Sequence, residues 1–331
     1  MELRALGRYG LETSTLGLGC MGMSEFYGTP DQAEALRTIR RALDLDVTLI
    51  DTADMYGQGT NEKLVGEGLR QNRERAVLAT KVGIVRARDG AYAGQNGRPD
   101  YIRAACEASL GRLGVDVIDL YQLHRVDPEV PIEESVGAMG ELINEGKVRF
   151  LGLSEAMPED IRRAAAAAPI SALQNEYSLF ERSIEDETLS VIEELGIGLL
   201  AYAPLGRGML TGRYRTTEAF EPGDWRLGGP RWDAANLGRN LELVDAVERL
   251  ATTRGVQPGQ LALAWLTHQR PWVVPIPGTR RVRWVEENAA AADVSLSAAD
   301  VAALTEAVPR SAIAGDRYPP ERMPTWVTPE Q

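Results

Sequence analysis

The chain has 331 residues, and its 36 basic and 48 acidic side chains give a net charge of −12. Hydrophobic residues make up 44% of the sequence and charged residues 25%, as in folded globular proteins, which excludes an intrinsically disordered chain. The acidic balance argues against DNA or RNA as a partner, because phosphate recognition uses basic surfaces.

Eight short apolar runs of strand length alternate with longer amphipathic stretches. In chain order they are Leu16–Leu18, Val47–Ile50, Val77–Thr80, Ile118–Leu123, Phe150–Leu153, Ala172–Gln174, Leu199–Tyr202 and Val273–Ile276. Strands separated by helices form parallel sheets. We therefore predict an α/β protein with a (β/α)8 TIM barrel, formed as a single domain by residues 1–331. An open doubly wound sheet is the alternative.

Three stretches between these runs carry helical periodicity. Their apolar faces are Leu36, Ile39 and Leu43; Ile132, Val136, Met139 and Ile143; and Ile184, Val191, Ile192 and Leu195. Thr29–Gln32 predicts a capping box with Pro30 at the first helical position, and Ser183 predicts a second helix start. Gly146 and Gly196 are expected to end helices.

Three irregular segments are expected near the mouth of the barrel. They are residues 89–99 around Tyr92, the long loop 205–236 after the seventh strand with Trp225 and Trp232, and the C-terminal tail after Pro309 with Tyr318 and Trp326. Long loops in a compact domain are often functional, and in a barrel they shape the face where ligands bind.

Membrane, disulfide and metal signals are weak. No apolar run approaches the roughly 18 residues of a membrane helix, and the N-terminus lacks the apolar core of a signal peptide. Cys20 and Cys106 are expected to be free thiols, with one disulfide as the alternative, and no metal-ligand spacing is present. We expect a cytoplasmic protein without a membrane partner, and the sequence indicates no oligomeric state.

Gly17–Gly22 matches the glycine pattern G-x-G-x-x-G of dinucleotide-binding folds but lacks its context. The last glycine of that pattern must open a helix. Here eight residues, including Gly28 and Pro30, separate Gly22 from Asp31. We interpret these glycines as a tight strand end beside a ligand.

Polar side chains end the predicted strands where burial alone would not place them. Asp51, Lys81 and His124 end three consecutive strands, Tyr56 follows Asp51 closely, and Ser154, Gln174 and Tyr202 end the next three. In a barrel these strand ends share one face.

The residue types at these ends suit carbonyl reduction. A tyrosine hydroxyl has a pKa of about 10, and a neighbouring lysine cation is expected to lower it. Asp51 would hold Lys81 charged, and His124 would donate a hydrogen bond to a carbonyl oxygen. No Ser or Cys nucleophile paired with a base is evident, which disfavours covalent hydrolysis.

With these residues the sequence resembles the aldo-keto reductase superfamily, and it is most similar to the branch with pyridoxal-reductase-like and auxin-induced-protein-like members. The resemblance covers nearly the whole chain. Its segments are Asp51–Gly57 with Gly59–Glu62, Ala79–Lys81, Leu123–Arg125, Gly152–Ser154, Leu173–Ser178, Ala201–Gly208 and Pro275–Thr279 with Glu287–Asn288.

The resemblance implies a barrel that binds NADPH or NADP+ and a catalytic tetrad of Tyr56, Asp51, Lys81 and His124, with Tyr56 as the general acid. It places Ser154 and Gln174 on the nicotinamide carboxamide and Tyr202 against the nicotinamide ring. The other cofactor residues that it implies are Gly19, Cys20, Met21, Asp51, Ala203, Pro204, Leu205, Arg207, Gly278, Thr279, Arg280, Glu287 and Asn288.

Two positions depart from the pattern of many relatives. Glu155 stands where they carry Asn, which puts one carboxamide contact in doubt, and Trp284 stands where they carry a smaller or polar residue near the adenine. The cluster of Arg280, Arg281 and Arg283 follows the last strand, and a 2′-phosphate would explain its charge. The sequence does not indicate which of the three contacts that phosphate.

We expect an NADPH-dependent oxidoreductase that reduces aldehydes or ketones to alcohols. The alternative is a cofactor-binding, redox-sensing subunit that acts through a protein partner. The aromatic residues Tyr27, Tyr92, Trp225 and Trp232 favour an apolar pocket for flat or aromatic carbonyl compounds. The physiological substrate and the direction of the reaction in the cell are not encoded in any recognisable pattern.

Overall fold

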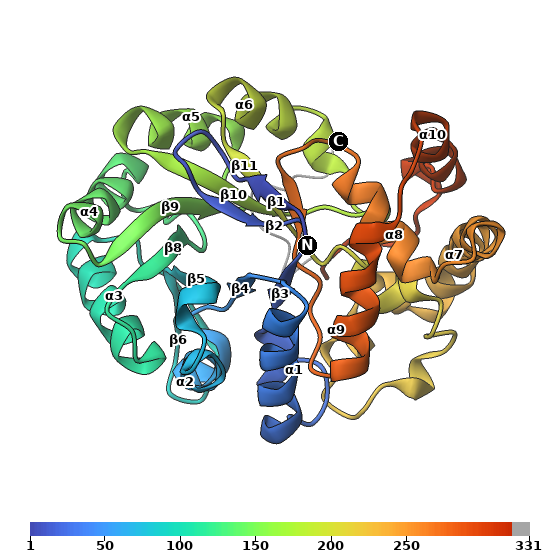
Figure 1. The fold of residues 1–331 in the computed structure, drawn as a ribbon, viewed down its shortest axis with the longest axis horizontal. Coiled ribbons are helices and arrows are strands. Elements are labelled where there is room, and N and C mark those ends of the chain that lie inside the picture. The colour runs from blue at the N-terminus through green and yellow to red at the C-terminus, as the bar shows by residue number, and fades with distance from the viewer. Residues whose placement is uncertain (320–331) are drawn as a thin grey trace.

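Eight parallel strands form a nearly closed barrel in the computed structural model, which describes residues 1–319 (Figure 1). Around the barrel they are β3 (Gly17–Gly19), β4 (Leu49–Asp51), β5 (Val77–Val82), β8 (Ile118–Leu123), β9 (Val148–Ser154), β10 (Ile170–Glu176), β11 (Gly198–Tyr202) and β12 (Val273–Pro275). A parallel bridge between Gly19 and Gly278 joins the two ends, and the Gly19 amide donates to the Pro277 carbonyl at 3.2 Å. The predicted (β/α)8 barrel is confirmed, and the open sheet is excluded.

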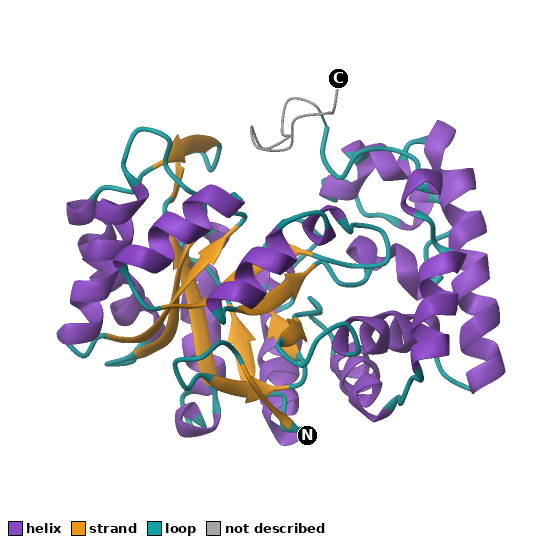
Figure 2. Ribbon diagram, turned by 90° about the horizontal axis from the view of Figure 1, so that it is seen from above, coloured by secondary structure: helices purple, strands orange, loops and turns teal. Residues whose placement is uncertain are grey.

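The α-helices surround the strands, and most of them cover the outside of the barrel (Figures 1 and 2). They are α1 (Gln32–Asp44), α2 (Thr60–Leu69), α3 (Pro99–Leu113), α4 (Ile132–Asn144), α5 (Pro158–Ala167), α6 (Thr188–Leu195), α7 (Ala234–Arg254), α8 (Pro258–Thr267), α9 (Val282–Ala289) and α10 (Ala298–Ala307). Ile39 and Val136 are fully buried, as the helical periodicity predicts. Gly146 and Gly196 take left-handed φ values of 73° and 66° directly after α4 and α6, so both helix ends are confirmed.

Two predicted helix starts are wrong in detail. Asp31 caps α1 by accepting from the Glu34 amide at 3.0 Å, so Pro30 precedes the cap instead of opening the helix. Ser183 caps no α-helix, because its hydroxyl donates to the Glu181 carboxylate at 2.7 Å. Ile184 therefore belongs to a separate turn of 3-10 helix, and α6 begins only at Thr188.

An antiparallel hairpin of β1 (Leu3–Ala5) and β2 (Glu12–Ser14) closes the N-terminal end of the barrel. Its connection inserts Leu6 and Leu11 into the barrel interior. There they pack in one buried cluster with Leu49, Ala79, Leu120, Ala172, Leu200, Val274 and Ile276. This end of the barrel is therefore filled with apolar side chains and leaves no space for a ligand.

The polar layer of the barrel lies directly above this apolar cluster. Side chains alternate between the two faces of a strand, so residues two positions after a cluster member also point inward. Asp51 follows Leu49, and Lys81 follows Ala79, in this way. The same spacing places Gln122, Gln174 and Tyr202 in this layer, at the carboxyl ends of their strands. Sequence position alone thus brings the candidate residues to one level of the barrel.

Three excursions surround the carboxyl ends of the strands. The segment expected to be irregular, residues 89–99, contains β7 (Tyr92–Gln95), which forms a hairpin with β6 (Ile84–Arg86). The predicted long loop after the seventh barrel strand contains four short 3-10 helices between Gly206 and Trp232. The described part of the C-terminal tail ends at Pro319, and Trp326 lies outside the described residues.

Both cysteines are buried and free, as expected. Within residues 1–319, none of the helices is long and apolar enough to cross a membrane.

Candidate active site

The structure brings Asp51, Lys81, Tyr56 and His124 together at the carboxyl ends of the strands. The Lys81 ammonium donates to Asp51 Oδ1 at 2.6 Å, to the Thr52 carbonyl at 2.8 Å and to the Tyr56 hydroxyl at 3.4 Å. The rings of Tyr56 and His124 meet edge to face, with centroids 5.8 Å apart. Both aromatic residues line the same cavity, so a reacting group beside the phenol would also lie beside the imidazole.

A strained turn after β4 sets the position of Tyr56. Gly57 and Gln58 both take left-handed φ values, 52° and 50°, which turn the chain sharply into α2. The turn is held by Asn61, which accepts from the Thr52 hydroxyl at 2.6 Å and donates to the Cys20 carbonyl at 2.9 Å. These contacts tie the tyrosine turn to both neighbouring strand ends, so the phenol is oriented before any ligand binds.

Burial decides the protonation state of the phenol. It raises the pKa of Tyr56, and the opposing effect of the Lys81 cation does not cancel that rise. The expected lowering of the tyrosine pKa by lysine is therefore wrong as a net effect, because a fully enclosed phenolate loses its hydration. The phenol stays protonated at neutral pH and can act as a proton donor.

Lys81 itself stays charged. Burial lowers the pKa of its ammonium, but the Asp51 carboxylate and the Tyr56 phenol together raise it above the usual value. A fully enclosed cation persists when a carboxylate lies within hydrogen-bond distance. The site therefore holds a fixed positive charge next to the phenol.

His124 is neutral in this environment. Burial, followed by the charges of Arg125 and Lys81, lowers the pKa of its imidazole well below the usual value. Its Nδ1 atom has no hydrogen-bond partner within residues 1–319. A neutral imidazole donates from one ring nitrogen only, so His124 can offer a hydrogen bond to an oxygen without transferring a full charge.

Two glutamines complete the surroundings of Asp51. Gln174 donates to Asp51 Oδ2 at 2.9 Å, and Gln122 lies 3.4 Å from the same oxygen. Gln122 was not singled out from the sequence, although it lies two residues before His124 on the same face of its strand. Ser154 is also at this level, and its hydroxyl accepts from Arg125 at 3.1 Å.

A cavity of about 1650 Å³ opens above the tetrad. Sites for one small ligand usually measure about 300–1,000 Å³, so this one has room for two ligands side by side. Most of the residues predicted for the cofactor line it: Gly19, Met21, Asp51, Ser154, Gln174, Tyr202, Ala203, Pro204, Leu205, Arg207, Gly278, Thr279, Arg280 and Asn288.

Cys20 and Glu287 do not line the cavity. Cys20 is fully buried, and burial, with the Asp51 charge, raises the pKa of its thiol, so it is unreactive. Glu287 is paired with Arg213. Both side chains thus have partners within the protein instead of facing the space where a cofactor would lie.

Gly19 forms part of the cavity floor and has no side chain. A Cβ atom at Gly19 would come within 3.1 Å of the Ile276 carbonyl oxygen, where the barrel closes. A larger residue would fit there only if the backbone of Ile276 moved by a few tenths of an ångström, and glycine leaves the floor open next to Asp51. This is the shape that a flat ring of a dinucleotide needs, so the described residues fit such a cofactor.

The three arginines of the basic cluster do not all have the same environment. Arg280 and Arg281 line the cavity, whereas Arg283 stacks on Trp284 with 3.7 Å between the guanidinium carbon and the ring centre. Arg213 approaches the same ring at 3.4 Å. Trp284 is therefore held between guanidinium groups, which favours Arg280 or Arg281 as the phosphate ligand.

The aromatic lining differs from the expected set at one position. Tyr27, Tyr92 and Trp225 line the cavity as expected. Trp232 does not, because it is buried and packs edge to face against Phe220 with 4.9 Å between ring centres. Tyr318 lines the cavity instead, which agrees with the expected place of the C-terminal tail at the barrel mouth, although the predicted set of pocket aromatics did not include it.

Comparison with known proteins agrees with this geometry. The model of the Aldo/keto reductase family matches residues 15–309. The chain is 44% identical over 310 residues to the aldo-keto reductase yakc of Schizosaccharomyces pombe, whose name specifies NADP(+), covering 92% of this chain and 91% of that protein. It is also 44% identical over 315 residues to a probable aldo-keto reductase of Glycine max, covering 95% and 90%.

Solved structures agree with the sequence relatives. A glycerol dehydrogenase from Gluconobacter oxydans superposes with a TM-score of 0.85 at 33% identity, covering 93% of this chain and 95% of that one. An aldo-keto reductase from Bacillus halodurans gives a TM-score of 0.78 at 30% identity, covering 94% and 97%. With the barrel, the tetrad geometry and a family match over most of its length, this chain belongs to the aldo/keto reductase family.

Proposed function

We propose that this family member reduces aldehydes or ketones to alcohols with NADPH and that Tyr56 is the general acid. The observation that carries the proposal is the contact of the Lys81 ammonium with the Tyr56 hydroxyl, 3.4 Å apart at the floor of the cavity. NADPH, when bound, supplies the hydride for the carbonyl carbon. The relative from Schizosaccharomyces pombe, whose name specifies NADP(+), supports this choice of cofactor.

The proton for the product oxygen comes from Tyr56. Its phenol is protonated because burial raises its pKa, and Lys81 stabilises the phenolate that remains after donation. His124 offers a hydrogen bond to the same oxygen as negative charge develops there. Asp51 keeps Lys81 charged and aimed at the phenol through the 2.6 Å contact.

The cofactor would lie in the same cavity, next to the tetrad. Ser154, Gln174 and Tyr202 would hold the nicotinamide end, and Gly19 would leave the floor open beneath it. Ala203–Leu205 and Arg207 would follow the pyrophosphate. Arg280 or Arg281, next to Thr279, would pair with the 2′-phosphate, since a guanidinium forms two parallel hydrogen bonds with such a group.

The aromatic lining favours flat substrates. Tyr27, Tyr92 and Trp225 offer ring faces and edges, on which an aromatic aldehyde gains more than an aliphatic one of equal size. The free thiols of Cys20 and Cys106 favour a reducing, cytoplasmic compartment.

A direct assay distinguishes this proposal from a redox-sensing subunit. The protein is saturated with NADPH and offered aromatic aldehydes, quinones and pyridoxal, and NADPH consumption and alcohol formation are measured. Reduction of an aldehyde to its alcohol supports the proposal. Tight NADPH binding without consumption across the panel would contradict it and favour a sensor that acts through a protein partner.

A further inference from the structure

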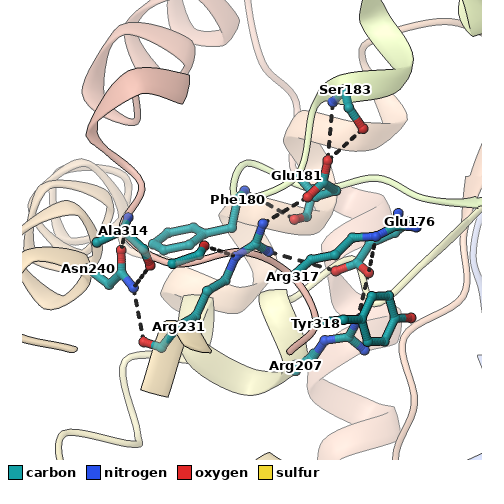
Figure 3. Close-up of polar contacts among 12 residues, drawn as sticks. Glu176, Phe180, Glu181, Ser183, Arg207, Arg231, Asn240, Ala314, Arg317 and Tyr318 are labelled. Atoms are coloured by element: carbon teal, nitrogen blue, oxygen red, sulfur yellow. Dashed lines mark hydrogen bonds and ion pairs between the residues drawn. The ribbon is translucent and has the colours of Figure 1, made fainter. Parts of the chain in front are cut away.

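Six charged side chains form a network at one side of the cavity, where Arg207 lines it. Figure 3 shows the contacts around Glu176, with Arg207, Arg231 and Arg317. Arg207 pairs with Glu176 at 2.7 Å, Arg231 pairs with Glu181 at 2.8 Å, and Arg317 pairs with Glu155. Arg231 and Arg317 also lie 3.9 and 4.0 Å from Glu176. The three acids and three bases come from the ends of β9 and β10, the loop after β10, the long loop after β11 and the C-terminal segment.

The network holds the C-terminal segment by buried contacts. The Arg317 side chain is 4% exposed and Glu155 is 1% exposed, so their pairing excludes water. Three residues before Arg317, the Ala314 amide donates to the Asn240 side chain and the Ala314 carbonyl accepts from it, both at 2.9 Å. By contrast, the Arg310–Asp186 pair on the same segment has side chains 41% and 65% exposed. Such exposed pairs contribute little to stability.

Docking of Arg317 fixes the next residue, Tyr318. The Tyr318 hydroxyl lies 3.2 Å from the Tyr202 hydroxyl. Its ring lies 4.8 Å from the Arg207 guanidinium carbon, and Trp225 lies 4.4 Å from the same carbon. Arg207, itself held by Glu176, thus joins two rings that both line the cavity.

The partners of Glu155 explain why an acidic residue follows β9. Although burial raises its pKa, the Arg317 and Arg125 guanidinium groups lower the pKa to about 2, so it is ionised. One of its oxygens accepts from the Glu176 amide at 3.0 Å. Glu155 is absent from the cavity lining formed by residues 1–319. The departure from asparagine therefore serves the C-terminal segment instead of a ligand.

We propose that Arg317 is a positioning residue that docks the C-terminal segment on Glu155 and Glu176 and so makes Tyr318 a fixed, specificity-determining wall of the cavity. The wall formed by Tyr318 and Trp225 selects flat, π-rich carbonyl compounds over small aliphatic ones. This inference rests on the proposed carbonyl reduction for its kinetic readout, while the docking itself is independent of activity.

The test compares four single variants of the full chain, and one double variant that combines Glu155→Gln with Tyr318→Ala, with the wild type. Tyr318→Ala removes the wall, Tyr318→Phe keeps the ring, Glu155→Gln weakens the anchor, and Asp186→Asn changes the exposed pair as a matched control. For each, kcat/KM is measured with benzaldehyde and with propanal, the Kd for NADPH by fluorescence titration, and amide hydrogen exchange over residues 309–319 by mass spectrometry.

Tyr318→Ala is expected to lower kcat/KM for benzaldehyde about tenfold and to leave that for propanal within about twofold, because it removes an aromatic contact. Tyr318→Phe retains the wild-type ratio. Glu155→Gln raises amide exchange over residues 309–319 and lowers the benzaldehyde-to-propanal ratio of kcat/KM, as Tyr318→Ala does. The double variant has the same ratio as Tyr318→Ala alone, because the two residues act through one contact. Asp186→Asn changes neither readout, and the Kd for NADPH stays constant.

An unchanged benzaldehyde-to-propanal ratio in Tyr318→Ala overturns the specificity role. Unchanged exchange in Glu155→Gln overturns the anchoring role. A wild-type protein that reduces neither aldehyde defeats the proposed carbonyl reduction instead, and the exchange measurement then still decides whether Glu155 anchors the segment.

Discussion

Replacement of Asp51 by asparagine probes the buried ion pair on which the site depends. The Asp51 and Lys81 side chains are 5% and 0% exposed, and their charged atoms lie 2.6 Å apart. Removing one partner of such a pair leaves an uncompensated charge in a medium that cannot hydrate it, at a cost of about 3–5 kcal/mol. We expect Asp51→Asn to lose that much free energy of unfolding at pH 7, together with most of its reductase activity.

The pH dependence of this loss identifies its cause. In the wild type Asp51 raises the pKa of Lys81, so the pair stabilises the fold below the unfolded pKa of 10.5. In the variant the Asp51 charge no longer opposes burial, the largest effect, and the Tyr56 phenol alone raises the pKa of Lys81. That pKa falls, so below pH 10.5 the folded variant loses the proton-linked stability that Asp51 supplies in the wild type. The difference in unfolding free energy between the two proteins should therefore be larger at pH 7 than at pH 10, and it should disappear only above the raised pKa of Lys81.

Urea unfolding followed by circular dichroism at both pH values measures this difference. The matched control is Glu194→Gln, which breaks the exposed Arg162–Glu194 pair, with side chains 46% and 62% exposed, and should leave the free energy of unfolding nearly unchanged at both pH values. A loss below about 1 kcal/mol for Asp51→Asn at pH 7, or an equal loss at pH 7 and pH 10, would refute the reasoning.

Three further predictions follow from single positions. Burial, with the Glu62 charge, raises the pKa of Asp54 from 3.8 to about 8, so the free energy of unfolding should fall as the pH rises from 6 to 8. In Asp54→Asn this fall should disappear, as measured by the midpoints of urea unfolding. A variant whose stability falls with pH as in the wild type would contradict the raised pKa. Gly19→Ala places a Cβ atom 3.1 Å from the Ile276 carbonyl oxygen, and we expect a loss of about 1–3 kcal/mol in unfolding free energy and weaker NADPH binding; wild-type values for both would exclude a tight floor. In fluorescence titrations, Arg280→Ala should raise the Kd for NADPH about tenfold or more and leave the Kd for NADH unchanged, because only NADPH carries a 2′-phosphate. An equal change for both cofactors would assign Arg280 to loop packing.

The sequence predicts the barrel because its signals are local and repeated. Each strand is a short apolar run, and several polar residues lie two positions beyond an inward apolar side chain, as Asp51 does beyond Leu49. The tetrad follows from the same regularity, since parallel strands bring their carboxyl ends to one face. Helix boundaries are less regular. Ile184 fits the period of α6, yet the Ser183 hydroxyl bonds to Glu181 and the chain turns before the helix begins.

Long-range pairing and burial are the parts that periodicity does not encode. Arg317 and Glu155 are 162 residues apart, and nothing around either residue identifies its partner. Trp232 and Tyr318 are both aromatic residues in irregular segments, but only the fold decides that Tyr318 lines the cavity and Trp232 packs inside the protein. The net pKa of Tyr56 likewise depends on enclosure, which outweighs the lysine charge that the sequence shows.

Single-turnover kinetics of Tyr56→Phe test the proton-donor assignment most directly. The change removes one hydroxyl and keeps the ring against His124, so NADPH binding should be retained. With an aldehyde that the wild type reduces, we predict that the rate of NADPH consumption falls by about 10²-fold or more, as for loss of a general acid. A variant that binds NADPH and reduces the aldehyde at the wild-type rate would contradict the assignment.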